Sequence, residues 1–201
     1  MINRLISLLK LVRVRQWIKN FAIFAAITFS GELFTLTIFQ KVLFAFIVFC
    51  MLSSATYIIN DAFDIKKDRL HPFKRFRPLA NRDIPIFLAF IIALVLIVVS
   101  LFLGLFVNLG FFILAIVYLL VQLLYSIFLK SIAIVDILAI ASGYILRVYA
   151  GEAASGFHIS VWLLLTVISV SLFLAIGKRR SELTLLSTNK DVNVALVRKS
   201  L

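Results

Sequence analysis

The stretch YIINDAFDIKKDRLHPFKRFRP, residues 57–78, begins as the end of an apolar run and turns abruptly polar. The chain is 63% hydrophobic and has nine acidic residues in 201. Three of these nine, Asp61, Asp64 and Asp68, fall within this stretch, and basic residues follow at once. We interpret the change from apolar to charged residues as the edge of a membrane, where the chain gathers its few carboxylates.

Other apolar runs along the chain are long enough to cross a bilayer, which takes about 20 residues each. The mean hydropathy of +1.12 and the 15% of charged residues exclude an ordinary soluble domain. We therefore predict an all-α fold, a polytopic transmembrane helical bundle. Six spans are expected, at residues 14–31, 41–60, 84–106, 109–129, 132–150 and 160–177.

The basic residues predict how this bundle is oriented. All but two of the 21 Lys and Arg residues lie near the start of the first span, between the second and third, between the fourth and fifth, or after the sixth. The exceptions are Lys41 and Arg147. Because basic residues concentrate on the cytoplasmic side, we expect a multi-pass protein of the cell inner (plasma) membrane whose acidic stretch faces the cytoplasm. Anionic lipid headgroups explain the net charge of +12, so nucleic acid is not an expected partner.

The acidic stretch has the spacing of a metal site if the second span continues as a helix past residue 60. Helical geometry then places four polar side chains within about 100° of one another: Asn60, Asp61, Asp64 and Asp68. Stacked carboxylates repel, and a hard divalent cation relieves the repulsion while leaving coordination positions for phosphate oxygens. This pattern predicts Mg²⁺ bound by Asp61, Asp64 and Asp68. The alternative is a solvated helix end with mixed charges.

Basic residues behind the carboxylates favour a phosphorylated ligand. Lys74, Arg75 and Arg77 lie in a loop bounded by Pro72 and Pro78. Carboxylates for a metal and cations for phosphates together make a diphosphate site. The same basic residues also suit a topology anchor, and both interpretations stay open.

Two further spans carry ionisable or phenolic groups at the same membrane edge. The fifth span has Asp136 near its cytoplasmic end and Arg147 near its middle. Ionisable residues within a span usually face a cavity or a partner, and an internal structural pair is the alternative here. The fourth span ends in YSIFLK, which contains Tyr125 and Lys130.

The first span contributes a polar cluster of its own. Gln16 and Asn20 are one helical turn apart, and Lys19 lies beside them. We expect these residues to reach the same cytoplasmic-side cavity as the polar groups of the other spans.

These motifs resemble a known family. NDAFDIKKD fits the N-D-x-x-D-x-x-x-D signature of the UbiA superfamily of intramembrane prenyltransferases. The set RQWIKN, NDAFDIKKDRLHPFKRFRPLA, YSIFLK, DILAIASGYILRVYAG and LAIGKRRSEL resembles its polyprenyl-phosphate phosphoribosyltransferase branch. The resemblance implies a bundle of nine transmembrane helices around a cavity open to the cytoplasm. Residues 1–201 are then expected to form one UbiA-like transmembrane domain without the C-terminal helices of the family.

The resemblance also implies a reaction. Phosphoribosyl pyrophosphate is the donor, a polyprenyl phosphate lipid is the acceptor, Mg²⁺ bridges the aspartate cluster to the diphosphate, and pyrophosphate is released. Asn60 would orient the diphosphate, and Lys74, Arg75 and Arg77 would bind it or the 5-phosphate of the sugar. Asp136 could orient the ribose hydroxyls. The expected contacts of the lipid phosphate are Lys19, Tyr125, Lys130 and Arg147, and Asn20 is expected to be a further substrate-binding residue.

Two other functions remain as alternatives. A UbiA-type prenyltransferase would move a prenyl group from a prenyl diphosphate to an aromatic or lipid acceptor, which requires an apolar tunnel for its donor. A membrane transporter would use the acids as an ion site, but transport sites usually lie near the midplane rather than at one face. Association into a homo-oligomer is left open.

Overall fold

A computed structural model describes residues 2–131 and 133–188 of this chain. The helices in that part, with η for a 3₁₀ helix, are α1 Ile2–Leu11, η1 Val14–Phe24, α2 Ala25–Phe29, α3 Leu36–Leu70, η2 Lys74–Phe76, α4 Ile86–Val107, α5 Leu109–Ile127, η3 Leu129–Ser131, α6 Ala133–Ser155 and α7 Val161–Thr188.

Five of these helices are long and apolar enough to cross a membrane: α3, α4, α5, α6 and α7. They correspond to the second to sixth spans expected from the sequence, and they confirm an all-α polytopic membrane bundle. Helix α3, which corresponds to the second expected span, runs without a break to Leu70, so the acidic stretch lies on its last turns. The residue after its last helical residue is His71, whose extended backbone suits the position before Pro72.

The first expected span, residues 14–31, differs from the expectation. It is a 3₁₀ helix of 11 residues followed by an α-helix of 5, so the described chain has five long α-helical spans where six were expected. A 3₁₀ helix rises about 2.0 Å per residue against about 1.5 Å in an α-helix. The two pieces together therefore cover about 30 Å, close to the thickness of a hydrocarbon core.

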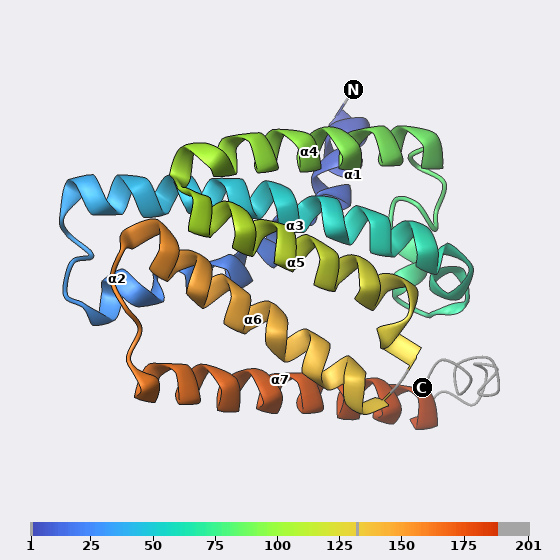
Figure 1. The fold of residues 1–201 in the computed structure, drawn as a ribbon. Helices are drawn as coiled ribbons and strands as arrows, with labels where there is room; N and C mark the ends of the chain where they lie inside the picture. The colour runs from blue at the N-terminus through green and yellow to red at the C-terminus, as the bar shows by residue number, and fades with distance from the viewer. Residues whose placement is uncertain (1, 132, 189–201) are drawn as a thin grey trace.

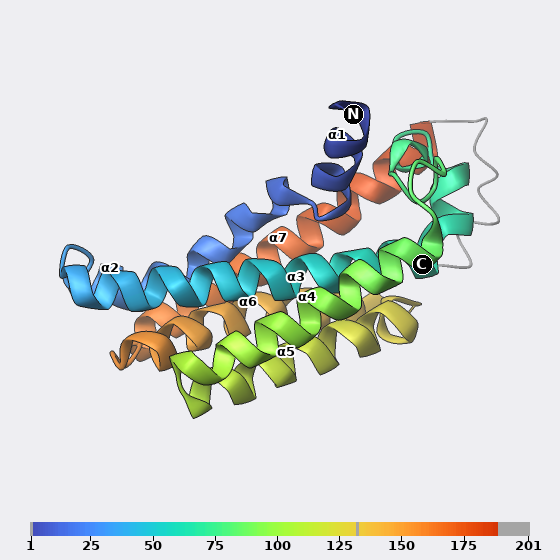
Figure 2. The same ribbon diagram turned by 90° about the horizontal axis from the view of Figure 1, so that it is seen from above.

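Helix α3 is the centre of the bundle and packs against η1, α4, α5 and α6 (Figures 1 and 2). The largest core cluster lies where Phe49 of α3 meets Phe111 and Tyr118 of α5. The ends of α3, α5 and α7 and the starts of α4 and α6 gather at one end of the bundle, on the right of Figure 1. This end collects the polar groups that the sequence places near one membrane edge.

The 3₁₀ helix lies close against α6 because the facing residue has no side chain. A Cβ atom added to Gly151 would lie 1.9 Å from the backbone oxygen of Ile23. Small residues allow this close approach of helices in a membrane protein. The contact fixes how deep η1 sits beside the polar end of the bundle.

Candidate functional site

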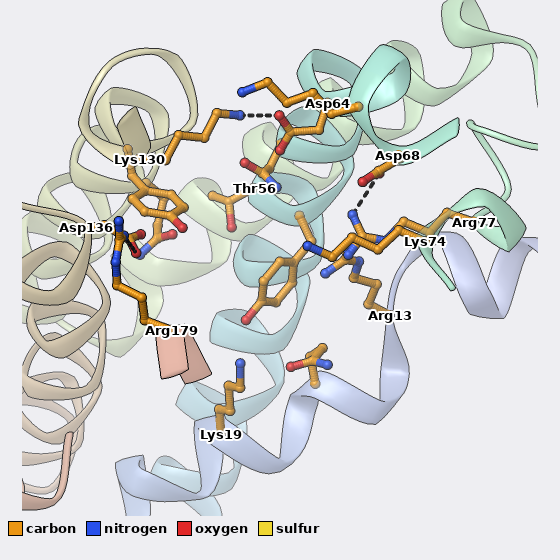
Figure 3. Close-up of a pocket in the computed structure, with 16 residues that line it drawn as sticks. Arg13, Lys19, Thr56, Asp64, Asp68, Lys74, Arg77, Lys130, Asp136 and Arg179 are labelled. Atoms are coloured by element: carbon orange, nitrogen blue, oxygen red, sulfur yellow. Dashed lines mark hydrogen bonds and ion pairs between the residues drawn. The ribbon is translucent and has the colours of Figure 1, made fainter. Parts of the chain in front are cut away.

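A polar pocket of about 350 Å³ opens at the gathered helix ends (Figure 3). The segment around η1, the end of α3, the loop with η2, α5, η3, α6 and α7 all contribute to its wall. The lining residues are Arg13, Gln16, Lys19, Thr56, Tyr57, Asn60, Asp64, Lys67, Asp68, Lys74, Arg77, Gln122, Tyr125, Lys130, Asp136 and Arg179. Side chains that are far apart in the sequence therefore share one cavity.

Carboxylates of α3 bind basic side chains from other segments. Asp61 is 3% exposed, and its two oxygens accept hydrogen bonds from Arg13 and from Arg77 Nη1, the latter at 3.0 Å. The same Nη1 lies 2.7 Å from Oδ2 of Asp68, so Arg77 bridges two carboxylates. Lys130 Nζ donates to Oδ1 of Asp64 at 2.6 Å. These pairs tie the loop and η3 to the end of α3.

A further ion pair lies on the opposite wall of the pocket. Arg179 Nη1 of α7 is 3.3 Å from Oδ2 of Asp136 in the first turn of α6. Figure 3 shows Asp136 and Arg179 at the left of the cavity, below Lys130, with Asp68 and Arg77 at its right. Cations and carboxylates of both walls are thus arranged around a central space where an anion and a metal ion can bind.

Oxygen atoms suited to a hard cation line the part of the pocket formed by α3. Oδ1 of Asn60 is fully buried and has no hydrogen-bond partner among the described residues. Asn60 shares this wall with Asp64 and Asp68. Amide and carboxylate oxygens are the ligands that Mg²⁺ takes, usually one or two carboxylates together with water and substrate phosphates. An orphaned oxygen beside two carboxylates fits that donor set.

These donors are not grouped as a closed metal centre. Among the side chains that the structure describes, no three acidic, His or Cys groups are close enough to hold a metal ion by themselves. Asp61 lies behind the pocket wall, where both of its oxygens accept from arginines. Binding of Mg²⁺ by Asp61, Asp64 and Asp68 together stays a prediction.

A second polar cluster lies below the pocket, inside the bundle. Arg147 of α6 is 4% exposed and donates to Asn20 Oδ1 at 2.7 Å, to the Gly143 oxygen at 2.6 Å and to the Tyr118 hydroxyl at 2.9 Å. Asn20 in turn donates to Cys50 and Ser53 of α3. All the hydrogen-bond acceptors of this guanidinium are neutral.

The sequence profile of the UbiA prenyltransferase family matches residues 20–179. The chain belongs to the UbiA prenyltransferase family. It is 41% identical to the decaprenyl-phosphate phosphoribosyltransferase of Mycolicibacterium smegmatis, over 99% of this chain and 63% of that protein. The corresponding protein of Corynebacterium glutamicum is 38% identical, over 97% of this chain and 59% of that protein. The chain thus spans about three fifths of the length of these relatives.

Solved UbiA structures have the same fold. A UbiA homolog from Archaeoglobus fulgidus bound to DMAPP and Mg²⁺ superposes with a TM-score of 0.71 at 20% identity, over 85% of this chain and 62% of that one. A structure of a digeranylgeranylglyceryl phosphate synthase gives 0.70 at 24% identity, over 88% of this chain and 61% of that one. At these identities the likeness concerns the fold.

Most of the site residues expected for a UbiA protein line the pocket. Those inside it are Lys19, Asn60, Asp64, Asp68, Lys74, Arg77, Tyr125, Lys130 and Asp136. Asn20, Asp61 and Arg147 are buried behind its walls. Arg75 lies outside, with its guanidinium 4.8 Å from the centre of the Phe76 ring.

The position of Asn20 departs from the sequence expectation for a physical reason. In an α-helix Gln16 and Asn20 would share a face, because they are four residues apart. In the 3₁₀ helix, residues three apart are aligned, so Gln16 shares the pocket face with Lys19. Asn20 turns into the bundle and binds Arg147.

Sequence reasoning missed several lining residues. Arg13 is one of several basic residues near the start of the first expected span, and Arg179 lies in LAIGKRRSEL, a motif that carries only the family resemblance. Thr56 and Tyr57 precede the acidic stretch by less than two helical turns and share its face, which is a signal that could have found them. Gln122 lies in an otherwise apolar run and gave a weaker signal.

Proposed function

We propose that this chain carries the active site of a Mg²⁺-dependent transferase that moves 5-phosphoribose from phosphoribosyl pyrophosphate to a polyprenyl phosphate. The 41% identity to a decaprenyl-phosphate phosphoribosyltransferase, over 99% of the chain, is the observation that supports this most strongly. The proposal places the pocket on the cytoplasmic side of the plasma membrane, because the basic residues gather at that end of the bundle.

The charge of the pocket suits this donor. Seven cationic side chains and three carboxylates from the described residues line it. Phosphoribosyl pyrophosphate brings a diphosphate and a separate 5-phosphate, so its charge exceeds what one divalent ion neutralises. The excess of cations can bind the remaining phosphate, and charge-assisted hydrogen bonds of this kind are the strong ones.

Different residues of the pocket bind the metal ion and the phosphates of the donor in this proposal. Asn60, Asp64 and Asp68 would hold Mg²⁺, which when bound neutralises charge on the diphosphate and so stabilises it as a leaving group. Lys130 lies within reach of Asp64 and can donate to a diphosphate oxygen. Lys74 lines the pocket from the loop, and it would bind the 5-phosphate of the sugar.

The acceptor needs little activation. An oxygen of the lipid phosphate attacks the anomeric carbon, the bond from that carbon to the pyrophosphate oxygen breaks, and pyrophosphate leaves with the bonding electrons. Because the phosphate is already anionic, the pocket has to position it and exclude water rather than supply a strong base. The carboxylate of Asp136 is paired with Arg179, and in this proposal it orients the ribose hydroxyls.

Labelled donor tests this reaction directly. Membranes that contain the full-length protein are given phosphoribosyl pyrophosphate with a labelled 5-phosphate, decaprenyl phosphate and Mg²⁺, and the label is expected in the lipid extract. Replacing Lys74 with Gln should raise the KM for the donor roughly tenfold to a hundredfold, the value of one charge-assisted contact. Arg75→Gln is the matched control, because Arg75 lies outside the pocket.

A prenyl transfer activity is the second candidate. The chain is 33% identical, over 128 residues, to a digeranylgeranylglyceryl phosphate synthase of Sulfurisphaera tokodaii. If the protein is a prenyltransferase, labelled prenyl diphosphate should enter a lipid or aromatic product while phosphoribosyl pyrophosphate stays unused. Such a result would replace the phosphoribosyl assignment and leave the metal site as proposed.

A further inference from the structure

Helix α1 projects from the bundle, and Figures 1 and 2 both show it running across the long spans rather than along them. Leu11, at its end, is 1% exposed and belongs to the core cluster around Ile58 of α3. The apolar residues before Leu11 are uncovered: Ile6, Leu8 and Leu9 are 43%, 39% and 51% exposed. A helix of 10 residues is marginal in water unless it packs against something. This apolar surface therefore calls for a cover.

The depth of α1 follows from the point where its end is attached to α3. The backbone oxygen of Val12 accepts a hydrogen bond from Ser54 Oγ at 2.7 Å. Ser54 lies six residues before Asn60, about 9 Å along the helix axis, and the apolar run of α3 gives way there to the acidic stretch. Interfacial helices bury their apolar face about 5–10 Å into the boundary between headgroups and acyl chains. A helix that runs across the spans at this depth lies in the plane of the membrane surface, on the side of the pocket.

The side chains around α1 suit such a position. Ile6 and Leu9 are three residues apart, so they share a face, and at 100° per residue this face points away from the buried Leu11. Leu8 lies on the flank, where it lines a groove of about 330 Å³ that also includes Leu88 of α4. The far face of α1 can therefore enter the acyl region of a bilayer, while the groove can take an acyl chain.

The charge of the N-terminal segment favours an anionic surface. Residues 1–31 contain five Lys or Arg residues and no Asp or Glu. Arg13 is paired with Asp61, whereas Lys10 and Arg15, on either side of it in the sequence, are exposed. Each basic residue beside an anionic leaflet strengthens membrane binding by about a factor of five. An apolar face next to exposed basic residues is the pattern of a helix that lies in the interface.

We propose that α1 binds anionic phospholipids in the plane of the membrane, and that this contact holds Arg13 at the pocket wall. Ile6 and Leu9 enter the acyl region, Lys10 and Arg15 bind headgroup phosphates, and an acyl chain occupies the groove between α1 and α4. The partner is a lipid of the bilayer itself and not a substrate. The inference is therefore independent of which group the protein transfers.

Arg13 connects α1 to the pocket. Its left-handed backbone, with φ of 53°, turns the chain from α1 into η1. Its guanidinium lines the pocket and donates to both oxygens of Asp61, from Nε at 3.0 Å. A residue keeps such a backbone conformation only when its surroundings hold it there. The bonds to Asp61 hold it on one side, and the lipid contact of α1 holds it on the other.

Spin labels on the full-length protein in nanodiscs test where α1 lies. Leu9→Cys and Lys10→Cys are labelled one at a time in a Cys50→Ala background, and collisions of each nitroxide with oxygen and with a water-soluble nickel chelate are measured. Phe102→Cys of α4 and Arg75→Cys of the loop, both exposed, give the reference values for acyl chains and for water. The label at position 9 should resemble the acyl reference, and the label at position 10 should meet the nickel chelate more often.

Two results of this measurement would overturn the inference. Equal access of the nickel chelate to both positions, at the level of the loop reference, would place α1 in water. Protection of both labels from both reagents would show that protein, rather than lipid, covers the helix.

Thermal unfolding tests the charge and the link to Arg13. The wild type should melt about 2–4 °C higher in nanodiscs that contain phosphatidylglycerol than in pure phosphatidylcholine. Lys10→Gln combined with Arg15→Gln should remove most of this shift. Lys66→Gln combined with Arg75→Gln is the matched control, because it removes the same charge from exposed positions beyond the acidic stretch and should keep the shift. Arg13→Gln should lose the shift while the label at position 9 stays in the acyl region.

The melting temperatures can also contradict the proposal. A shift that is absent in the wild type, or that persists in full after the loss of Lys10 and Arg15, would remove anionic lipid as the partner of α1. A full shift in Arg13→Gln would show that lipid binding is not transmitted to the pocket. Neither measurement uses transfer activity, so a failure here leaves the proposed reaction untouched.

Discussion

At the scale of single residues, the aspartates of α3 differ in what surrounds them. Asp61 is buried between the guanidinium groups of Arg13 and Arg77. Asp64 lines the pocket, and within the described part of the chain it accepts one hydrogen bond, from Lys130. The first carboxylate therefore holds the N-terminal segment and the loop in place, whereas the second can exchange its partner for a metal ion. The same substitution should have different consequences at the two positions.

We expect Asp64→Asn to abolish Mg²⁺-dependent transfer while the melting temperature of the purified protein stays close to that of the wild type. Asp61→Asn removes the carboxylate that binds Arg13 and one of the two carboxylates that bind Arg77, and it should cost on the order of 3 kcal/mol of stability. Activity of membranes and thermal unfolding in detergent measure the two effects.

Asp83→Asn is the control for this pair, because Asp83 is an exposed carboxylate whose side chain accepts from Asn81. Neither activity nor stability should change in that variant. Normal turnover of Asp64→Asn would remove this carboxylate from the metal site. An Asp61→Asn protein that is inactive yet fully stable would instead make Asp61 a ligand.

At the scale of elements, the 3₁₀ helix decides which residues of the N-terminal segment reach the pocket. Runs of 3₁₀ helix longer than three or four residues are uncommon, and η1 has 11. Its hydrogen bonds to α3 and α6 supply the stabilisation that the 3₁₀ backbone lacks. The left-handed backbone of Arg13, with φ of 53°, marks the break from α1 and is held by the bonds to Asp61.

Gly151→Ala should displace this helix. The new methyl group would overlap the backbone oxygen of Ile23, which cannot move without the rest of η1. Overpacking of this kind typically costs about 1–3 kcal/mol. Cys50 is the single cysteine and is covered by Asn20 of η1, so its reaction with a maleimide should accelerate when η1 moves.

Gly177→Ala is the matched control in α7, because a Cβ atom there meets nothing within 4 Å. Its Cys50 should stay as unreactive as in the wild type. Slow labelling of Cys50 in the Gly151→Ala protein, together with unchanged thermal unfolding, would show that η1 does not depend on this close contact.

At the scale of the molecule, charge is concentrated at one end of the bundle. The ends of α3, α5 and α7 meet there with the starts of α4 and α6 (Figure 1). Lys41 lies near the start of α3, some 25 residues before the charged end of the same helix. One α-helix of 35 residues is about 50 Å long, so its two ends lie on opposite sides of a bilayer.

Cysteine labelling from each side should show this polarity. In a Cys50→Ala background, an impermeant maleimide is expected to label Lys66→Cys only in inside-out vesicles and Lys41→Cys only in intact cells. Both side chains are exposed, so access depends on the side of the membrane alone. Labelling with the opposite sidedness would invert the topology and move the pocket to the outer face.

The sequence by itself determined the class of fold and the end of the molecule that carries the site. Length and hydropathy predicted five spans that the structure contains. The spacing of Asn60, Asp64 and Asp68 predicted their common wall, because these residues lie within a few turns of one helix and its geometry is local. The sequence motifs were enough to predict the UbiA family, and the match of the family profile confirmed this prediction.

Only the tertiary structure decided which polar residues meet. The winding of η1 depends on its packing against α3 and α6, and no local pattern distinguishes it from an α-helix. That winding placed Lys19 in the pocket and Asn20 against Arg147. The ion pair of Asp136 with Arg179 joins α6 to α7 through two residues that are 43 positions apart along the chain. Such pairs form where the helices cross, and the crossing is set by packing that a single sequence does not display.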